Sequence, residues 1–304
     1  MSDDDSSLDE KRVYADREGA TTAFVASGAG VARVEVSADI VGEFTLQRRC
    51  TARDVAASTG RLAVATAGDV LVGTTDGLEP TGFGPATAVG YHDGPVAAGE
   101  GRLARYEDGW ETLTRLADVR AIDGDLVAAA DGVHRLDGTP LGLEAVNDVS
   151  TDGRPLAATD AGLYYLANGW TTAVEESFRV VARDADGGTA HAAGERLYER
   201  EAERSEASDE SSGRREARAK RAPRTGERRA ERAASTDHRE GRHASREDGE
   251  WRPVELPVDE RVTGVAYGAA TYAVTAAGTF LADAGDGWRH RSLGLPDVTG
   301  VVVP

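Results

Sequence analysis

All four tryptophans of this 304-residue chain follow the same kind of turn. Each stands directly after an Asp-Gly or Asn-Gly pair, or one residue beyond it, and the four are Trp110, Trp170, Trp251 and Trp288. A rare residue that recurs after one turn indicates an internal repeat, and a repeat constrains the fold more than composition does. The spacings fit a unit of about 30 to 40 residues, with an insertion between Trp170 and Trp251.

Within each unit the sequence predicts short strands joined by tight turns. The clearest copy runs from Val119 to Leu136, where a strand, an Asp-Gly turn, an alanine-rich strand and a third strand follow one another. Seven copies pair a small-residue strand with an alternating strand across a turn that usually contains glycine, which is the pattern of a β-hairpin. The fourth strand of the unit is the segment that carries the tryptophan in four of the copies.

Four short antiparallel strands repeated radially describe a β-propeller. We therefore predict an all-β fold with seven four-stranded blades, six being the alternative count. An array of β-sandwiches ranks lower, because a sandwich does not require one phrase at a fixed spacing. The last segment, Val298–Val303, resembles the start of the first strand in other units but has no second strand after it. We expect it to pair beside Thr21–Ser27 and close the ring, which removes exposed strand edges.

The chain divides into three parts by composition. Residues 1–11 are predicted to be an acidic disordered tail, and residues 12–304 a single propeller domain. Residues 201–247 contain no Val, Ile, Leu, Phe, Tyr or Trp and are rich in arginine. Such a segment cannot bury enough apolar surface to offset its ordering entropy, so we predict a disordered insert within a hairpin of the sixth blade. It is an inert expansion, a contact for an acidic partner, or, least favoured, a contact for nucleic acid.

Charge and cysteine content bear on the environment. The net charge is −18, and only two of the 35 basic residues are lysine. This balance favours a GC-rich, halophilic organism with a salt-loaded cytoplasm, because concentrated salt screens the repulsion of an acidic surface; an ordinary acidic protein is the alternative. We expect a cytoplasmic protein, since no apolar run is long enough to span a membrane and the first residues are acidic. The single Cys50 excludes an intramolecular disulfide and is expected to be inert.

Known catalytic motifs are absent from the sequence. It has no phosphate-binding Gly-rich loop ending in Lys-Ser or Lys-Thr, no Gly-x-Ser-x-Gly elbow and no cysteine pair for zinc. We therefore expect no cofactor and no metal. His92 and Asp93 form the one suggestive pair, and neighbouring residues of this kind are expected to form a turn rather than a catalytic dyad.

Two rings of side chains follow from the repeat. The second position of the aligned first strands should form a polar collar around the central channel, able to hold an anionic ligand or a partner carboxylate. The simpler interpretation is that these residues satisfy one another and the backbone between blades. The collar comprises Arg53, Thr87, Arg120, Asn147, Arg179, Thr263 and Thr299. A second ring is acidic, lies in the turns between second and third strands on the same face, and comprises Asp69, Glu100, Asp131, Asp160 and Glu195.

The alanine-rich second strands, the Asp-Gly-Trp phrases and the arginine-rich insert resemble an uncharacterised haloarchaeal β-propeller family. The resemblance covers nearly the whole chain and implies the fold and the source, but it brings no catalytic residues. The sequence lacks the Trp-Asp, kelch and sialidase repeat signatures of better-known propellers. We predict a non-catalytic interaction platform that binds a protein through its faces, with nucleic acid and membrane unlikely partners. The alternatives are an enzyme of the lactonase, lyase or glycosidase kind at the channel mouth and a binder of anionic small molecules.

Overall fold

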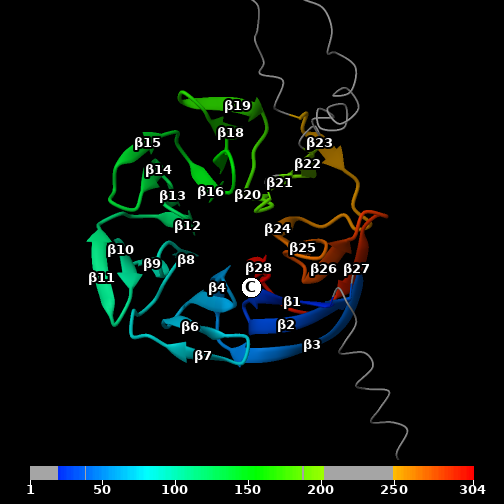
Figure 1. Cartoon of the computed structure of the whole chain (residues 1–304), viewed down its shortest axis with the longest axis horizontal. Helices are drawn as coiled ribbons and strands as arrows, with labels where there is room; N and C mark the ends of the chain where they lie inside the picture. Colours follow the sequence, from blue (N-terminus) through cyan, green and yellow to red (C-terminus); the bar gives the residue numbers. More distant parts are fainter. Residues whose placement is uncertain (1–19, 38, 187, 202–248) are drawn as a thin grey trace, which may run out of the picture. The chain divides into compact units, whose positions relative to one another are not determined.

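The computed structural model describes residues 20–37, 39–186, 188–201 and 249–304. The described residues belong almost entirely to one compact unit, Met1–Glu201 with Trp251–Pro304. The predicted acidic tail and nearly all of the predicted insert lie outside the described residues. In the described ranges the chain forms 28 strands, which make seven four-stranded antiparallel sheets. Figure 1 shows the sheets arranged as blades around an axis, and the prediction of a seven-bladed β-propeller is confirmed.

Each blade consists of four strands, from the innermost strand next to the axis to the outermost strand. The first blade contains β28 (Gly300–Val302), β1 (Ala20–Ser27), β2 (Gly30–Ser37) and β3 (Ile40–Arg49). The second contains β4 (Ala52–Ser58), β5 (Arg61–Thr66), β6 (Val70–Thr74) and β7 (Gly77–Pro80). The third contains β8 (Ala88–Tyr91), β9 (Pro95–Gly99), β10 (Arg102–Tyr106) and β11 (Trp110–Thr114).

The remaining four blades follow the same order along the chain. The fourth contains β12 (Val119–Asp123), β13 (Leu126–Ala129), β14 (Gly132–Arg135) and β15 (Pro140–Gly142). The fifth contains β16 (Val146–Ser150), β17 (Leu156–Thr159), β18 (Leu163–Leu166) and β19 (Trp170–Val174). The sixth contains β20 (Val180–Arg183), β21 (Thr189–Ala193), β22 (Leu197–Glu201) and β23 (Arg252–Val254). The seventh contains β24 (Val262–Tyr267), β25 (Thr271–Thr275), β26 (Thr279–Asp283) and β27 (Arg289–Ser292).

The ring closes through the C-terminal strand. β28 pairs with β1 in the register Phe24 to Val302, Val25 to Val301 and Ala26 to Gly300, and it lies between the inner strands β24 and β4. A side chain at Gly264 would place a Cβ 2.9 Å from the Gly300 Cα, so β28 can approach β24 this closely only because Gly264 has none. The predicted closure beside Thr21–Ser27 is confirmed.

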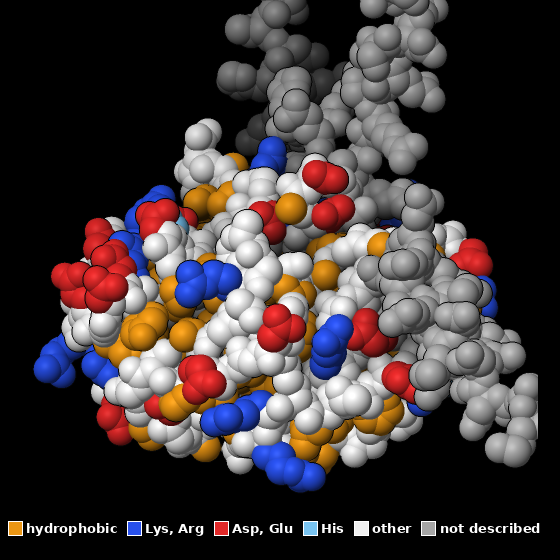
Figure 2. Space-filling model, turned by 60° about the horizontal axis from the view of Figure 1, so that its bottom comes forward, with side chains coloured by type: hydrophobic (Ala, Val, Ile, Leu, Met, Phe, Trp, Pro, Cys, Tyr) orange, Lys and Arg blue, Asp and Glu red, His pale blue; other side chains and the backbone are white. Residues whose placement is uncertain are grey.

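The hydrophobic core is divided among the joints between blades. The described residues form seven buried clusters, and each joins side chains of two neighbouring blades. Small residues on the second strands, such as Ala63, Ala128 and Ala273, are fully buried and let adjacent sheets pack closely. On the side of the ring shown in Figure 2, acidic and basic side chains are interspersed with apolar ones between them.

The tryptophans lie where the outer strands begin, as predicted. Trp110 and Trp170 are the first residues of β11 and β19, and Trp251 and Trp288 immediately precede β23 and β27. All four are partly buried, and each packs on the core cluster shared with the preceding blade. The indole Nε1 of Trp110 donates to Thr81 Oγ1 at 3.0 Å, and that of Trp170 donates to the Leu141 carbonyl at 2.9 Å. The tryptophans therefore anchor one blade to the next.

Candidate functional site

The seven inner strands surround a hollow on the axis with a volume of about 690 Å³. Because strands alternate in direction, the inner strands begin on the same face as the turns between second and third strands. We call this the collar face, since the predicted collar residues stand at the start of the inner strands. Six of the seven collar residues line the hollow, and Thr87 does not.

Four collar side chains bind the backbone of the following blade in one repeated pattern. Each donates to the carbonyl of the residue that opens the next aligned inner segment. The bonds run from Arg53 Nη1 to Ala86 (3.2 Å), Thr87 Oγ1 to Val119 (3.0 Å), Arg120 Nη1 to Val146 (3.2 Å) and Asn147 Nδ2 to Phe178 (2.8 Å). Thr263 and Thr299 instead donate to carbonyls of the second strand of their own blade, Val274 and Ala26, at 3.5 Å each. The collar thus contributes to the joints between blades.

The three collar arginines also present charge to the channel mouth. Arg53, Arg120 and Arg179 come from the second, fourth and sixth blades and are exposed. Arg120 also donates to the Asn147 Oδ1 at 2.7 Å. In the part of the chain that the structure describes, the Arg179 side chain makes no hydrogen bond or ion pair. A guanidinium has five N–H donors, so Arg53 and Arg120 retain donors after these bonds are made.

The predicted acidic ring occupies the turns between second and third strands, as expected. Asn147 Nδ2 donates to Asp160 Oδ1 at 2.8 Å, which places this ring member and the collar on the same face. Asp69 accepts from the backbone N–H groups of Gly82 and Gly84 at 3.0 and 3.1 Å, and Asp131 lies 3.0 Å from His134 Nε2. These bonds tie Asp69 to the connector at residues 82–84 and Asp131 to the third strand of its own blade.

Two channel carboxylates were not singled out by the sequence argument. Asp54 accepts the N–H of Val55 at 2.8 Å and that of Val89, on the next blade, at 2.9 Å. Asp148 repeats this arrangement with Val149 and, on the next blade, Val181, both at 2.9 Å. Burial raises the pKa of Asp54 to about 7 and that of Asp148 to about 8, although the two backbone N–H groups at each carboxylate act in the opposite direction.

A signal for these carboxylates is present in the sequence. In the aligned inner segments, Asp54 and Asp148 occupy the third position, directly before a valine in both cases. The strand register shifts between Ala52 and Asp54 and between Val146 and Asp148, so the second and third positions do not simply alternate in direction there. The recurrence of aspartate at one register position is the mark by which these inter-blade contacts could have been found.

The remaining candidates from the sequence, His92, Asp93 and Cys50, lie in a turn and at a partly buried position. His92 and Asp93 lie in the turn between β8 and β9, as expected, and Asp93 has a positive φ of 56°. Cys50 is partly buried, and burial raises the pKa of its thiol. Among the described residues, no group of three or more His, Cys, Asp or Glu side chains is arranged to hold a metal ion. No helix within the described ranges has the length and apolar character that crossing a bilayer requires.

Comparisons with known proteins show which fold and which family this chain shares. No curated protein sequence matches it. A functionally unknown protein from Desulfotomaculum acetoxidans DSM 771 superposes with a TM-score of 0.61 at 11% identity, over 93% of this chain and 98% of that one. AztD from Citrobacter koseri superposes with a TM-score of 0.49 at 8% identity, over 94% and 98% of the two chains. A family model described as HVO_0234-like β-propeller matches residues 7–304, and the chain therefore belongs to this β-propeller family.

Proposed function

We propose that this propeller is a non-catalytic binding platform and that a partner protein docks on its collar face with an acidic group at the axial mouth. The observation that carries this proposal is the position of Arg53, Arg120 and Arg179. These exposed guanidinium groups come from alternate blades and line one hollow on the axis.

The anchoring of two of these arginines favours binding. The bonds from Arg53 and Arg120 to carbonyls of the next blade fix one end of each guanidinium fork. A fixed fork loses less side-chain entropy when it binds a carboxylate, and charge-assisted bonds of this kind are stronger than neutral ones. The acidic residues around the mouth would repel an anionic partner that is not aligned with the axis, which adds specificity.

A second candidate is the binding of an anionic small molecule by the same arginines. The hollow of about 690 Å³ favours it, because ligand pockets commonly have volumes of about 300 to 1,000 Å³. A channel-mouth enzyme of the lactonase, lyase or glycosidase kind ranks lower. Asp54 and Asp148 would be its natural acids, yet each accepts two backbone N–H groups and links two blades, which supports a structural role.

Affinity purification from the native host at native salt tests the platform. The test variant is Arg53→Gln/Arg120→Gln/Arg179→Gln. The matched control, Arg49→Gln/Arg115→Gln/Arg261→Gln, removes the same charge from three exposed arginines on the same face, at the end of β3, directly after β11 and directly before β24. We expect the wild type and the control to recover a partner that the collar variant loses. Identical partner lists for all three proteins would contradict the proposal. Calorimetric titration with citrate as a probe tests the second candidate, because collar-dependent binding of citrate would favour a small-molecule site.

We also propose that the protein works in a salt-rich archaeal cytoplasm and that its basic insert contacts an acidic partner. The net charge of −18 and the near absence of lysine support the first part. Thermal melting in increasing potassium chloride tests it, and we expect the melting temperature to rise up to molar salt. Co-purification with and without residues 202–247 tests the second part. If the same partners are recovered with and without these residues, the insert is an inert expansion.

A further inference from the structure

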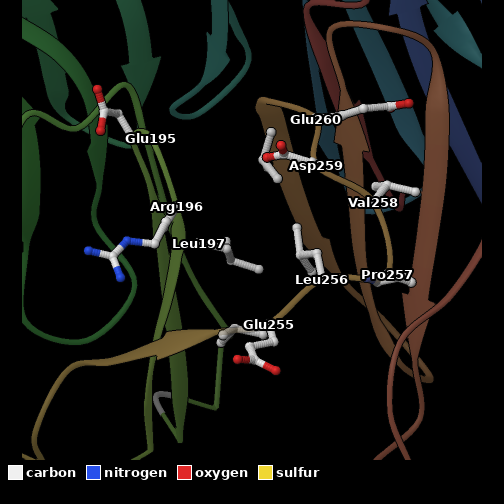
Figure 3. A pocket seen from close by; sticks show the side chains of 12 residues that line it. Glu195, Arg196, Leu197, Glu255, Leu256, Pro257, Val258, Asp259 and Glu260 are labelled. Carbon is white, nitrogen blue, oxygen red and sulfur yellow. The ribbon is translucent and has the colours of Figure 1, made fainter.

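The joint between the sixth and seventh blades contains a groove of about 480 Å³. One wall is the turn at residues 194–196 with the start of β22, and the other is the connector from Glu255 to Arg261 that leads into β24. Figure 3 shows the side chains of Leu197 and Leu256 pointing toward one another across it. Leu197 is buried, whereas Leu256 and Val258 are partly exposed, so the groove offers apolar surface to solvent.

The connector at this joint differs from four others at one position, although the first–second and fifth–sixth joints also hold a charged residue there, Arg49 and Glu175. Leu256 and Val258 of this connector pack on the core of the joint. At four other joints, the residue three positions before the aligned inner segment is apolar and packs on the core between the blades. These residues are Phe83, Leu116, Leu143 and Leu295. At the joint between the sixth and seventh blades that position holds Asp259, which is exposed. An unpaired carboxylate is costly to bury, so Asp259 cannot fill the joint as the apolar residues do.

The rim of the groove is acidic. Glu195, Glu255 and Asp259 are exposed, and within the described residues their side chains make no ion pair or hydrogen bond. Figure 3 shows Glu195 and Asp259 on opposite walls and Glu255 at the other end of the groove. Glu260 accepts a bond from Thr275 Oγ1 at 2.6 Å, and Arg196 is the one basic residue among those that line the groove.

We propose that this groove binds an extended segment of a partner protein in which apolar side chains alternate with arginine or lysine. The proposal rests on the platform function and gives the chemistry of a second contact on the collar face. In an extended segment, alternate side chains point to opposite sides. Apolar residues therefore enter the space between Leu197 and Leu256, while the long basic side chains reach the unpaired carboxylates of the rim.

A fluorescein-labelled octapeptide of alternating leucine and arginine is the probe, and binding is followed by fluorescence anisotropy. Two comparison peptides replace every arginine by glutamate or every leucine by serine. The charge variant is Glu255→Arg/Asp259→Arg. Its matched control, Glu144→Arg/Glu175→Arg, makes the same charge change at exposed connector residues of the collar face. A third variant, Asp259→Leu, supplies the apolar residue that closes other joints.

We expect the wild type to bind the leucine–arginine peptide at least tenfold more tightly than either comparison peptide. The charge variant should lose at least tenfold in affinity for this peptide, and its control should lose less than twofold. Asp259→Leu should lose peptide binding, and its melting temperature should be no lower than that of the wild type. The absence of binding up to about 1 mM peptide would overturn the proposal, as would equal losses in the charge variant and its control. Self-association that the Glu255→Arg/Asp259→Arg variant abolishes would assign the groove to a second copy of the chain and overturn it as well.

The collar variant separates this proposal from the platform function. Arg53→Gln/Arg120→Gln/Arg179→Gln leaves the groove unchanged and should bind the peptide as the wild type does. If the peptide fails to bind but a collar-dependent partner is still recovered from the host, the groove proposal falls and the platform stands. If the peptide binds and no collar-dependent partner exists, docking at the axial mouth falls and the groove remains a binding site.

Discussion

The joint between the second and third blades and the joint between the sixth and seventh blades are built from the same repeat but differ in closure. In the first, Phe83 is 6% exposed and its ring meets that of Trp110 edge-on, with centroids 4.6 Å apart. The guanidinium of Arg102 lies 4.2 Å from the centroid of the Phe83 ring. Asp54 then links the inner strands of the two blades through the Val89 N–H. An apolar residue and a carboxylate together close this joint.

Among the described residues, the joint between the sixth and seventh blades has neither an apolar residue at the corresponding connector position nor a carboxylate that links the inner strands. Asp259 replaces the apolar residue, and Val180 stands where Asp54 and Asp148 stand in their own inner segments. The link is instead Tyr267, whose hydroxyl donates to the Ala182 carbonyl at 3.2 Å and lies 2.8 Å from His191 Nδ1. Burial lowers the pKa of His191 to about 4, so the imidazole is neutral at neutral pH.

This difference indicates where a repeat fold obtains its binding surfaces. Each blade must bury its faces against its neighbours, and the connector usually supplies the last apolar side chain. At the joint between the sixth and seventh blades that position is charged, and part of the apolar surface of Leu256 and Val258 is exposed. We infer that a departure from the repeat, such as Asp259, can add a binding surface to the one that the repeat itself places at the axial mouth.

The largest expected effect is at the closed joint. Phe83→Ala removes a buried ring together with its contacts to Trp110 and Arg102, so it should lower the free energy of unfolding by about 3 to 5 kcal/mol. Leu256→Ala at the open joint should cost about half as much, because its side chain is already partly solvated. Equilibrium denaturation at constant salt measures both. Equal losses at the two positions would contradict the distinction between a closed and an open joint.

A smaller effect concerns the carboxylate that only the closed joint has. The folded-state pKa of Asp54, about 7, lies above the unfolded value near 4, so the folded protein retains a proton that the unfolded chain has released between these pH values. The free energy of unfolding should therefore fall as pH rises from about 4 to 7 and then level off.

The Asp54→Asn variant cannot titrate and should show a shallower fall over the same range. Asp108→Asn, at an exposed turn, serves as the control and should run parallel to the wild type. Parallel curves for Asp54→Asn and the wild type would show that Asp54 is ionised in the folded protein throughout the range.

The fold was accessible from the sequence because its signals are local and repeated. Tight turns before tryptophan, alanine-rich second strands and the resemblance of Val298–Val303 to other inner segments each recur at a fixed register. A recurring register gives strand order and ring closure without any knowledge of distant contacts. The positions of the collar and of the acidic ring followed from the same alignment.

The site was less accessible because it depends on contacts between blades. The alignment placed Arg53 and Arg120 at the mouth, but the carbonyls that they bind belong to the next blade, 33 and 26 residues along the chain. The link from Asp54 to Val89 has the same character. The groove was missed for a different reason: the connector residues that line it, from Glu255 to Glu260, gain meaning only once the joints between blades are known.

The smallest expected effect tests whether one residue decides between the two kinds of joint. Asp259→Leu removes an exposed charge and offers an apolar side chain to the space between Leu197 and Leu256, as Leu116 and Leu143 do at their own joints. Filling such a space commonly stabilises a protein by about 0.5 to 1 kcal/mol. Asp259→Asn removes the charge without filling the groove, so it separates the two contributions. Thermal melting of both variants at one salt concentration should show a rise for Asp259→Leu that exceeds any rise for Asp259→Asn. If the two variants melt together, the groove is held open by the longer connector around Leu256 and Val258, and the aspartate is not what distinguishes this joint from the closed ones.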